Sequence, residues 1–139
     1  MDEEQPLSAD AFLRKVESKR AVALATVGDR LACNEAWLAS GFAVEFAIKA
    51  LIMRKERLNA WPSKEARPDL YTHDLARLFQ IAGMDLKTAR KPLRGAIRTA
   101  LDWNRAHEYT SGRMSQANAR SMVAAVFGDE GVITWLNNQ

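Results

Sequence analysis

The segment 31–54 constrains the fold more than any other part of this chain, because its apolar side chains surround the whole circumference of the helix that it predicts. Such a helix is stable in water only where other helices cover it on every side. Small side chains recur along it at alternating spacings of four and three residues, forming a ridge that a second helix can approach closely: Ala36, Ser40, Ala43, Ala47 and Ala50. The sequence therefore predicts a buried central helix in an all-α protein.

One acid and one base interrupt this apolar segment. Glu45 and Lys49 are one helical turn apart, with the acid first, which is the favourable order for an ion pair. Because the surroundings are apolar, we expect the pair to be shielded from water. In that setting it fixes the register of packing more than it adds stability.

The spacing of apolar residues predicts further helices over 8–27, 72–82, 86–105 and 116–136, with a loop at 59–71 that contains Pro62 and Pro68. Ser8 or Asp10 is expected to cap the first helix. Pro92 must start or kink the fourth, and Gly128 and Gly131 favour a bend in the last. The buried side of the first helix is assigned to Leu7, Phe12, Leu13, Val16, Val22, Leu24 and Val27.

These elements predict an all-α, four- to five-helix up-and-down bundle. At 139 residues we expect one domain over 7–139, preceded by a flexible N-terminus at 1–6. That terminus is polar and acidic and lacks the pattern of a signal peptide, and no stretch approaches 18 uninterrupted apolar residues. We therefore expect a cytoplasmic protein without a membrane span.

Composition removes several classes of site. A single cysteine, Cys33, excludes an intrachain disulfide and a multi-cysteine metal site, and it is interpreted as a small apolar side chain. Two histidines are too few for the usual zinc motifs, and no glycine-rich phosphate loop follows a strand. We therefore expect no metal and no cofactor.

Basic residues are concentrated in the fourth predicted helix. Residues 87–105 contain six basic side chains and one acid, whereas the whole chain has a formal charge of only +3. On ideal helix geometry five of the six lie within about 40° of one direction; they are Lys87, Lys91, Arg94, Arg98 and Arg105. Such a face is typical of a phosphate-binding surface, and we predict nucleic-acid contact through Lys87, Lys91, Arg94 and Arg98. The alternative is a solvated helix face without a ligand.

Arg105, His107 and Tyr109 follow at the end of this basic segment. Histidine titrates near neutrality and can exchange a proton with a ribose hydroxyl, while arginine can hold a phosphate. Together they could cleave RNA without a metal, with the 2′-hydroxyl as nucleophile. The alternative is that His107 is a cation at a helix C-terminus and Tyr109 a packing aromatic. His73 is interpreted as a residue of the capping region beside Asp74, with a catalytic role as its alternative.

Three sequence blocks resemble the HEPN domain, a small all-helical module of prokaryotic toxin–antitoxin and defence systems. They are 34–54, 72–83 and 102–109, and the likeness covers about residues 8–136. The resemblance implies a homodimer packed through long helices, with an Arg-x(4–6)-His motif at the interface that cuts RNA without metal. It also implies a nucleotidyltransferase partner, which in some relatives modifies a tyrosine corresponding to Tyr109.

The chain departs from the family at the arginine. Arg105 precedes His107 by two residues and Arg98 by nine, so the family spacing is not reproduced there. Arg67 and His73 have the right spacing but span the proline loop, and we interpret that match as coincidence. Three hypotheses follow. The chain is a toxin-like, metal-independent endoribonuclease using Arg105, His107 and Tyr109; or it is a non-catalytic module that binds RNA, a nucleotide or a nucleotidyltransferase; or it is a helical interaction domain without a nucleic-acid role.

Overall fold

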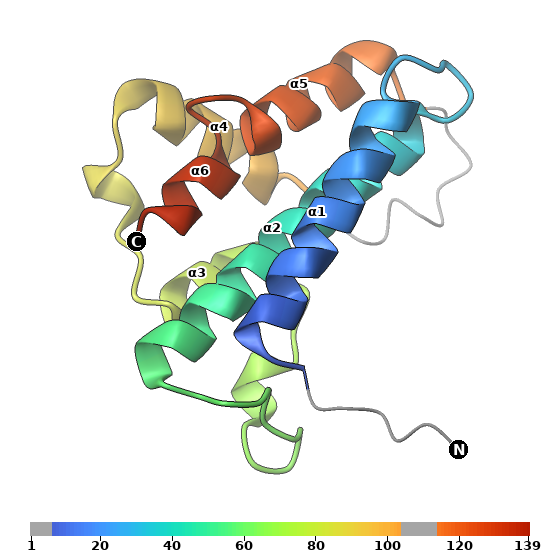
Figure 1. Ribbon diagram of the computed structural model, residues 1–139. Coiled ribbons are helices and arrows are strands. Elements are labelled where there is room, and N and C mark those ends of the chain that lie inside the picture. The colour runs from blue at the N-terminus through green and yellow to red at the C-terminus, as the bar shows by residue number, and fades with distance from the viewer. Residues whose placement is uncertain (1–6, 104–113) are drawn as a thin grey trace, which may run out of the picture.

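The structure is a computed structural model that describes residues 7–103 and 114–139, and every regular element in those ranges is helical (Figure 1). The all-α class is therefore confirmed, while the prediction for residues 1–6 lies outside the described residues. The elements are α1 Ala9–Thr26, α2 Cys33–Glu56, η1 Pro68–Leu70, α3 Leu75–Ile81, η2 Leu86–Thr88, α4 Lys91–Leu101, α5 Gln116–Phe127 and α6 Val132–Asn137, where η marks a 3-10 helix.

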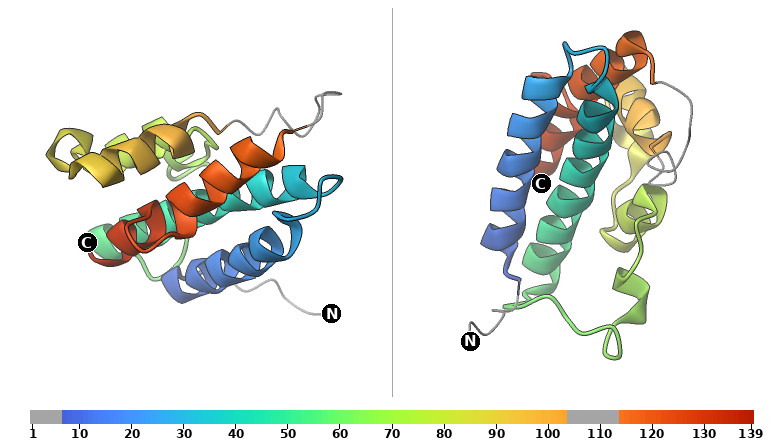
Figure 2. Two further views of the ribbon diagram at one scale, coloured as in Figure 1. Left: turned by 90° about the horizontal axis from the view of Figure 1, so that it is seen from above. Right: turned by 90° about the vertical axis from the view of Figure 1, so that its right-hand side faces the viewer.

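Helix α2 is the centre of the molecule, as predicted. It packs against α1 on one side and contacts α3, α5 and α6 elsewhere around its circumference (Figure 2). The five small residues of its ridge are all at most 2% exposed. Ala36 clusters with Ala23 of α1, and Ala50 clusters with Phe12 of the same helix. The small side chains thus let the two longest helices of the described chain lie against each other.

The length and apolarity of α2 would also suit a membrane span, with a mean hydropathy of 1.5 over its most apolar 18 residues. In the folded chain 89% of that window is buried against the other helices. Its apolar side chains therefore form the centre of the core, which is the usual reason for a helix that is apolar all round.

Helix α1 begins where the sequence predicts, but part of its predicted buried side is wrong. The Ser8 hydroxyl accepts a hydrogen bond from the Ala11 amide at 3.1 Å, so Ser8 is the N-cap. Val22 is 40% exposed and Leu24 51% exposed, although both were assigned to the core. They flank the buried Ala23, each turned about 100° from it, so they point away from the side that α2 covers.

Helix α4 is shorter than the predicted 86–105, and the last predicted helix is divided in two. Pro92 stands in the first turn of α4, where its missing N–H costs nothing, so it starts the helix and residues 86–88 form the separate η2. The helix is interrupted between α5 and α6, at Gly128–Gly131. A Cβ on Gly131 would lie within 2.9 Å of three backbone carbonyl oxygens, so this tight connection requires glycine.

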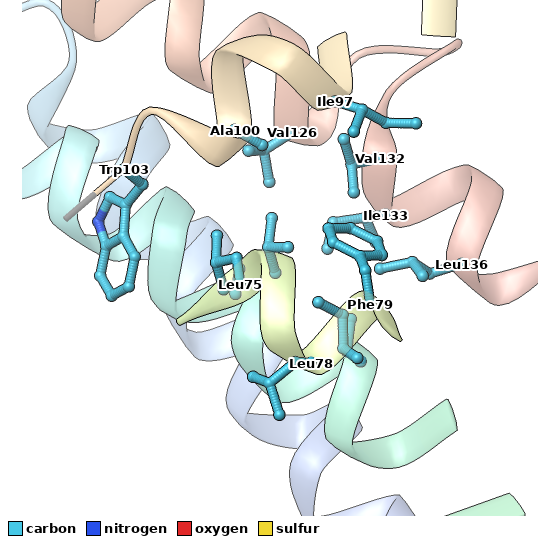
Figure 3. Close-up of a cluster of buried hydrophobic side chains, with 14 of the residues drawn as sticks. Leu75, Leu78, Phe79, Ile97, Ala100, Trp103, Val126, Val132, Ile133 and Leu136 are labelled. Atoms are coloured by element: carbon cyan, nitrogen blue, oxygen red, sulfur yellow. The ribbon is translucent and has the colours of Figure 1, made fainter. Parts of the chain in front are cut away.

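The core lies where α3, α4, α5 and α6 meet beside α2 (Figure 3). Phe79 of α3 points toward the side chains of α6, and its ring centroid lies 6.0 Å from that of Trp135. Helix α3 ends at Ile81, and Gly83 follows with φ +70°; the Met84 amide donates to the Phe79 carbonyl at 3.1 Å, which is a left-handed helix stop. Trp103, 6% exposed, closes one end of this core beyond α4.

Candidate nucleic-acid interface

The four residues predicted to bind nucleic acid are all exposed. Lys87 lies in η2, and Lys91, Arg94 and Arg98 lie on α4. None of their charged groups forms an ion pair with another residue of the described ranges. Their positive charge is therefore not neutralised within this part of the protein, and it is available to an anionic partner.

Three of these residues gather around one hollow. Lys87, Arg94 and Arg98 line it together with the apolar side chains of Leu86, Ile97 and Leu101, and its volume is about 290 Å³. Ile97 is 3% exposed and belongs to the core, so the base of the hollow is held rigidly. A cationic rim over an apolar floor suits a partner that has both phosphates and flat apolar faces.

The prediction that these basic residues share one face of a single helix is partly wrong. Helix α4 begins at Lys91, so Lys87 does not belong to the helix on which a shared face was predicted. Folding of η2 against α4 brings Lys87 to the hollow instead. Lys91 is exposed on α4 but does not line the hollow.

The predicted catalytic residues Arg105, His107 and Tyr109 lie outside the described residues. The last described residue before them is Trp103, two residues after the end of α4. Their roles therefore stay predictions. Among the described residues, no three side chains of His, Cys, Asp or Glu gather closely enough to hold a metal.

The predicted Glu45–Lys49 pair is confirmed, and it has a third member. Lys49 Nζ lies 3.2 Å from Glu45 Oε2, and Glu45 is only 2% exposed. Nδ1 of His73 lies 2.7 Å from the other carboxylate oxygen. Because an ionised carboxylate only accepts hydrogen bonds, Nδ1 carries the proton in this contact. The hydrogen bond between His73 and Glu45 ties α2 to the start of α3.

His73 directly precedes the N-cap of α3, so its assignment to the capping region is confirmed, and its contact with Glu45 of α2 is an addition that was not predicted. Asp74 caps α3, because its side chain accepts from the Arg77 amide at 3.3 Å, and the Asp74 amide in turn donates to the Thr72 hydroxyl at 3.0 Å. A signal for this contact was present in the sequence: an acid inside an apolar helix requires polar partners when it is buried. Which residue outside the helix supplies the second partner could not be read from spacing.

Arg67, the other half of the coincidental spacing match, is bound to two carboxylates. Its guanidinium donates to Glu56 and to both oxygens of Asp69, at 3.0 Å and 2.9 Å in the latter case. These hydrogen bonds hold the pKa of the Asp69 carboxyl below its ordinary value, because they favour the charged form. Arg67 thus ties the end of α2 to the proline loop.

A second hollow, of about 300 Å³, lies between the start of α4 and α6, and the sequence reasoning did not find it. Arg90 and Glu130 contribute opposite charges to it, and Trp135 contributes an aromatic ring; Pro92, Leu93, Gly131, Thr134 and Asn138 complete the lining. The residues that line it come from two segments, 90–93 and 130–138, which are about 40 residues apart in the chain, so no local sequence pattern joins them.

Compared with protein-family models, with curated proteins and with solved structures, the chain matches none of them. The HEPN resemblance therefore depends on the three sequence blocks alone.

Proposed function

We propose that this chain binds RNA through the hollow formed by η2 and α4, as a HEPN-type module. The observation that carries the proposal is the grouping of Lys87, Arg94 and Arg98, without ion pairs in the described ranges, around an apolar floor. Three cations at one hollow can neutralise successive phosphates of a strand and release their counterions. The apolar floor accepts the flat face of a base or a ribose.

Reversal of two of these charges tests the proposal. In Arg94→Glu combined with Arg98→Glu, we expect at least a tenfold loss of affinity for a fluorescein-labelled single-stranded RNA, measured by anisotropy. The slope of log affinity against log salt should also become shallower, by roughly 1 to 2 phosphate contacts. Both residues are exposed, so circular dichroism should show an unchanged fold.

The matched control is Arg14→Glu combined with Arg20→Glu, which makes the same change of net charge on α1. These residues are also exposed, and α1 lies on the other side of α2 from α4 (Figure 2). We expect the control to retain affinity within about threefold, the modest loss that long-range charge alone produces. Equal losses in both double variants, or no loss in the α4 variant, would contradict the proposal.

We propose RNA cleavage as the second function, with Arg105 orienting a phosphate, His107 transferring protons and Tyr109 as the regulatory hydroxyl. It is supported by sequence position, because the chain runs from the basic helix α4 directly into this segment. The purified protein should cut RNA in the presence of EDTA, and a 2′-deoxy substitution at the cut should prevent it. His107→Ala should abolish cleavage but keep RNA affinity. If the wild type binds RNA without cutting it, the chain is a non-catalytic binding module.

We further propose that the chain forms a homodimer. The apolar side chains of Val22, Leu24 and Leu31 are 40%, 51% and 79% exposed, which leaves apolar surface on α1 and the turn after it for a second copy to cover. Sedimentation equilibrium should give a mass near twice 15.5 kDa. A monomer at all concentrations would refute this part of the proposal.

A further inference from the structure

The hollow between α4 and α6 contains two opposite charges that do not neutralise each other. Arg90 and Glu130 both line it and both are exposed, yet neither forms an ion pair with any residue of the described ranges. A ligand in this hollow can therefore meet both a cation and a carboxylate. Such an arrangement suits a molecule with an anionic group at one end and hydrogen-bond donors at the other.

Trp135 gives this hollow an aromatic surface whose position is fixed. The indole is partly buried, and its ring lies 6.0 Å from that of Phe79 in the core, with an interplanar angle of 31°. The next residue along α6, Leu136, is buried at 1% exposure and anchors the helix. Since Trp135 also lines the hollow together with Pro92 and Leu93, a flat ring entering it meets apolar surface on more than one side.

We infer that this hollow binds a guanine base of single-stranded RNA, an inference that rests on the proposed RNA-binding function. The Watson–Crick edge of guanine presents two adjacent donors, the ring N1–H and the exocyclic amino group. A carboxylate presents two acceptors and can pair with both, so Glu130 would read guanine. Trp135 would stack on the base, and Arg90 would hold the phosphate of the same nucleotide.

The other bases fit this set of groups less well. Adenine has an acceptor beside its amino group, cytosine has the same pattern, and uracil has one donor between two acceptors. Each would place an acceptor against the Glu130 carboxylate, which is repulsive and leaves a polar group without a partner. The predicted selectivity therefore comes from Glu130, while Trp135 and Arg90 act on every nucleotide alike.

The two hollows share α4, so one RNA strand can reach both. Leu93 lines the hollow between α4 and α6, and Ile97 lines the hollow formed by η2 and α4; these residues are one turn apart, a rise of about 6 Å along the helix axis. Lys91 and Arg94, on the same stretch of α4, are exposed and basic. A strand that places a base beside Trp135 can thus lay its neighbouring phosphates against the cations of α4.

The test compares two labelled U-rich RNA nonamers that differ only in a central G or A, by anisotropy. We expect the wild type to bind the G-containing strand about 5- to 30-fold more tightly. Glu130→Gln should reduce this preference to within about twofold, because an amide offers one acceptor and one donor where the carboxylate offers two acceptors. Glu130 is exposed in a turn, so the variant should fold normally. Glu65→Gln, the same change at an exposed loop residue, should keep the preference.

A second pair of variants tests the stacking surface. Trp135→Leu should weaken both strands by about tenfold, whereas Trp135→Phe, which keeps an aromatic face and the packing on Phe79, should lose little. Thermal unfolding of both variants separates this effect from a loss of fold. If Trp135→Leu and Trp135→Phe are equally stable and lose RNA affinity equally, the role of stacking is refuted.

The remaining outcomes separate this inference from the proposed function. If the wild type binds both nonamers equally and reversal of Arg94 and Arg98 still weakens them, the guanine inference is wrong and the RNA-binding proposal stands. If that reversal changes nothing, the proposed function is wrong. If free guanosine monophosphate binds in a Glu130-dependent way while the nonamers show no preference, the ligand is a free nucleotide and the RNA inference is overturned.

Discussion

Gly41→Ala is the most informative single change for the packing of this fold. A Cβ built on Gly41 of α2 would lie 2.1 Å from Cε2 and Nε1 of the Trp103 indole, far inside ordinary van der Waals contact. The indole cannot simply move aside. It packs edge-on against Phe42 with ring centroids 5.1 Å apart, and it lies beside Trp37 at 6.2 Å.

The magnitude follows from two opposing effects. Replacing glycine by alanine in a helix interior stabilises the helix by about 1 kcal/mol. Overpacking a core costs about 1–3 kcal/mol, and losing the packing of a buried tryptophan costs about 3–5 kcal/mol. The Trp103 Nε1 has no hydrogen-bond partner among the described residues, so packing holds the ring. Because the new Cβ would displace the indole, the larger cost applies; after the gain of about 1 kcal/mol is subtracted, we expect Gly41→Ala to lower the free energy of unfolding by about 2–4 kcal/mol.

Urea denaturation followed by circular dichroism at the helix band measures this change. The control is Gly95→Ala, also in a helix interior but with no atom within 4 Å of the new Cβ, which should stabilise the protein by about 0.5–1 kcal/mol. Combining Gly41→Ala with Trp103→Ala should cost less than the sum of the single changes, because the methyl group then has room. A Gly41→Ala protein as stable as the Gly95→Ala protein, or additive single changes, would refute this account of the packing.

Two further predictions concern charged groups. Glu45→Ala leaves the Lys49 ammonium, 11% exposed, without its carboxylate and should lower the free energy of unfolding in urea by about 3 kcal/mol. The double variant Glu45→Ala with Lys49→Leu should regain most of that loss. Equal stability of Glu45→Ala and the wild type would count against a buried pair. Asp69 should titrate below the ordinary value for aspartate by NMR, because Arg67 holds its charged form, and Arg67→Ala should return its pKa toward that value. A carboxyl whose pKa is lower in the folded state stabilises the fold above its unfolded pKa, so this contribution is lost as the pH falls below about 4 through the folded pKa. An unshifted Asp69 in the wild type would show that the pair does not persist in solution.

Features within a single helix could be predicted from the sequence with few errors. The apolar circumference and small-residue ridge of α2, the Ser8 cap, the stop at Gly83 and the Glu45–Lys49 pair all depend on residues one or two helical turns apart. Their spacing on a helix is set by backbone geometry, which is the same in every protein. For the same reason Pro92 could be restricted to the start or a kink of α4, because a proline ring removes an N–H wherever it stands.

Contacts between different elements could be identified only from the tertiary structure. Val22 and Leu24 are apolar but exposed because no helix of residues 7–103 and 114–139 covers that side of α1, and His73 reaches Glu45 across 28 positions. The Arg90–Trp135 hollow joins residues about 40 positions apart. An apolar residue indicates a side chain that favours burial, and a charged residue indicates one that favours an oppositely charged or hydrogen-bonding partner. Neither residue type identifies which residue the neighbour is. That identity depends on how the helices pack, where many weak contacts compete and the best total arrangement, summed over the whole core, prevails.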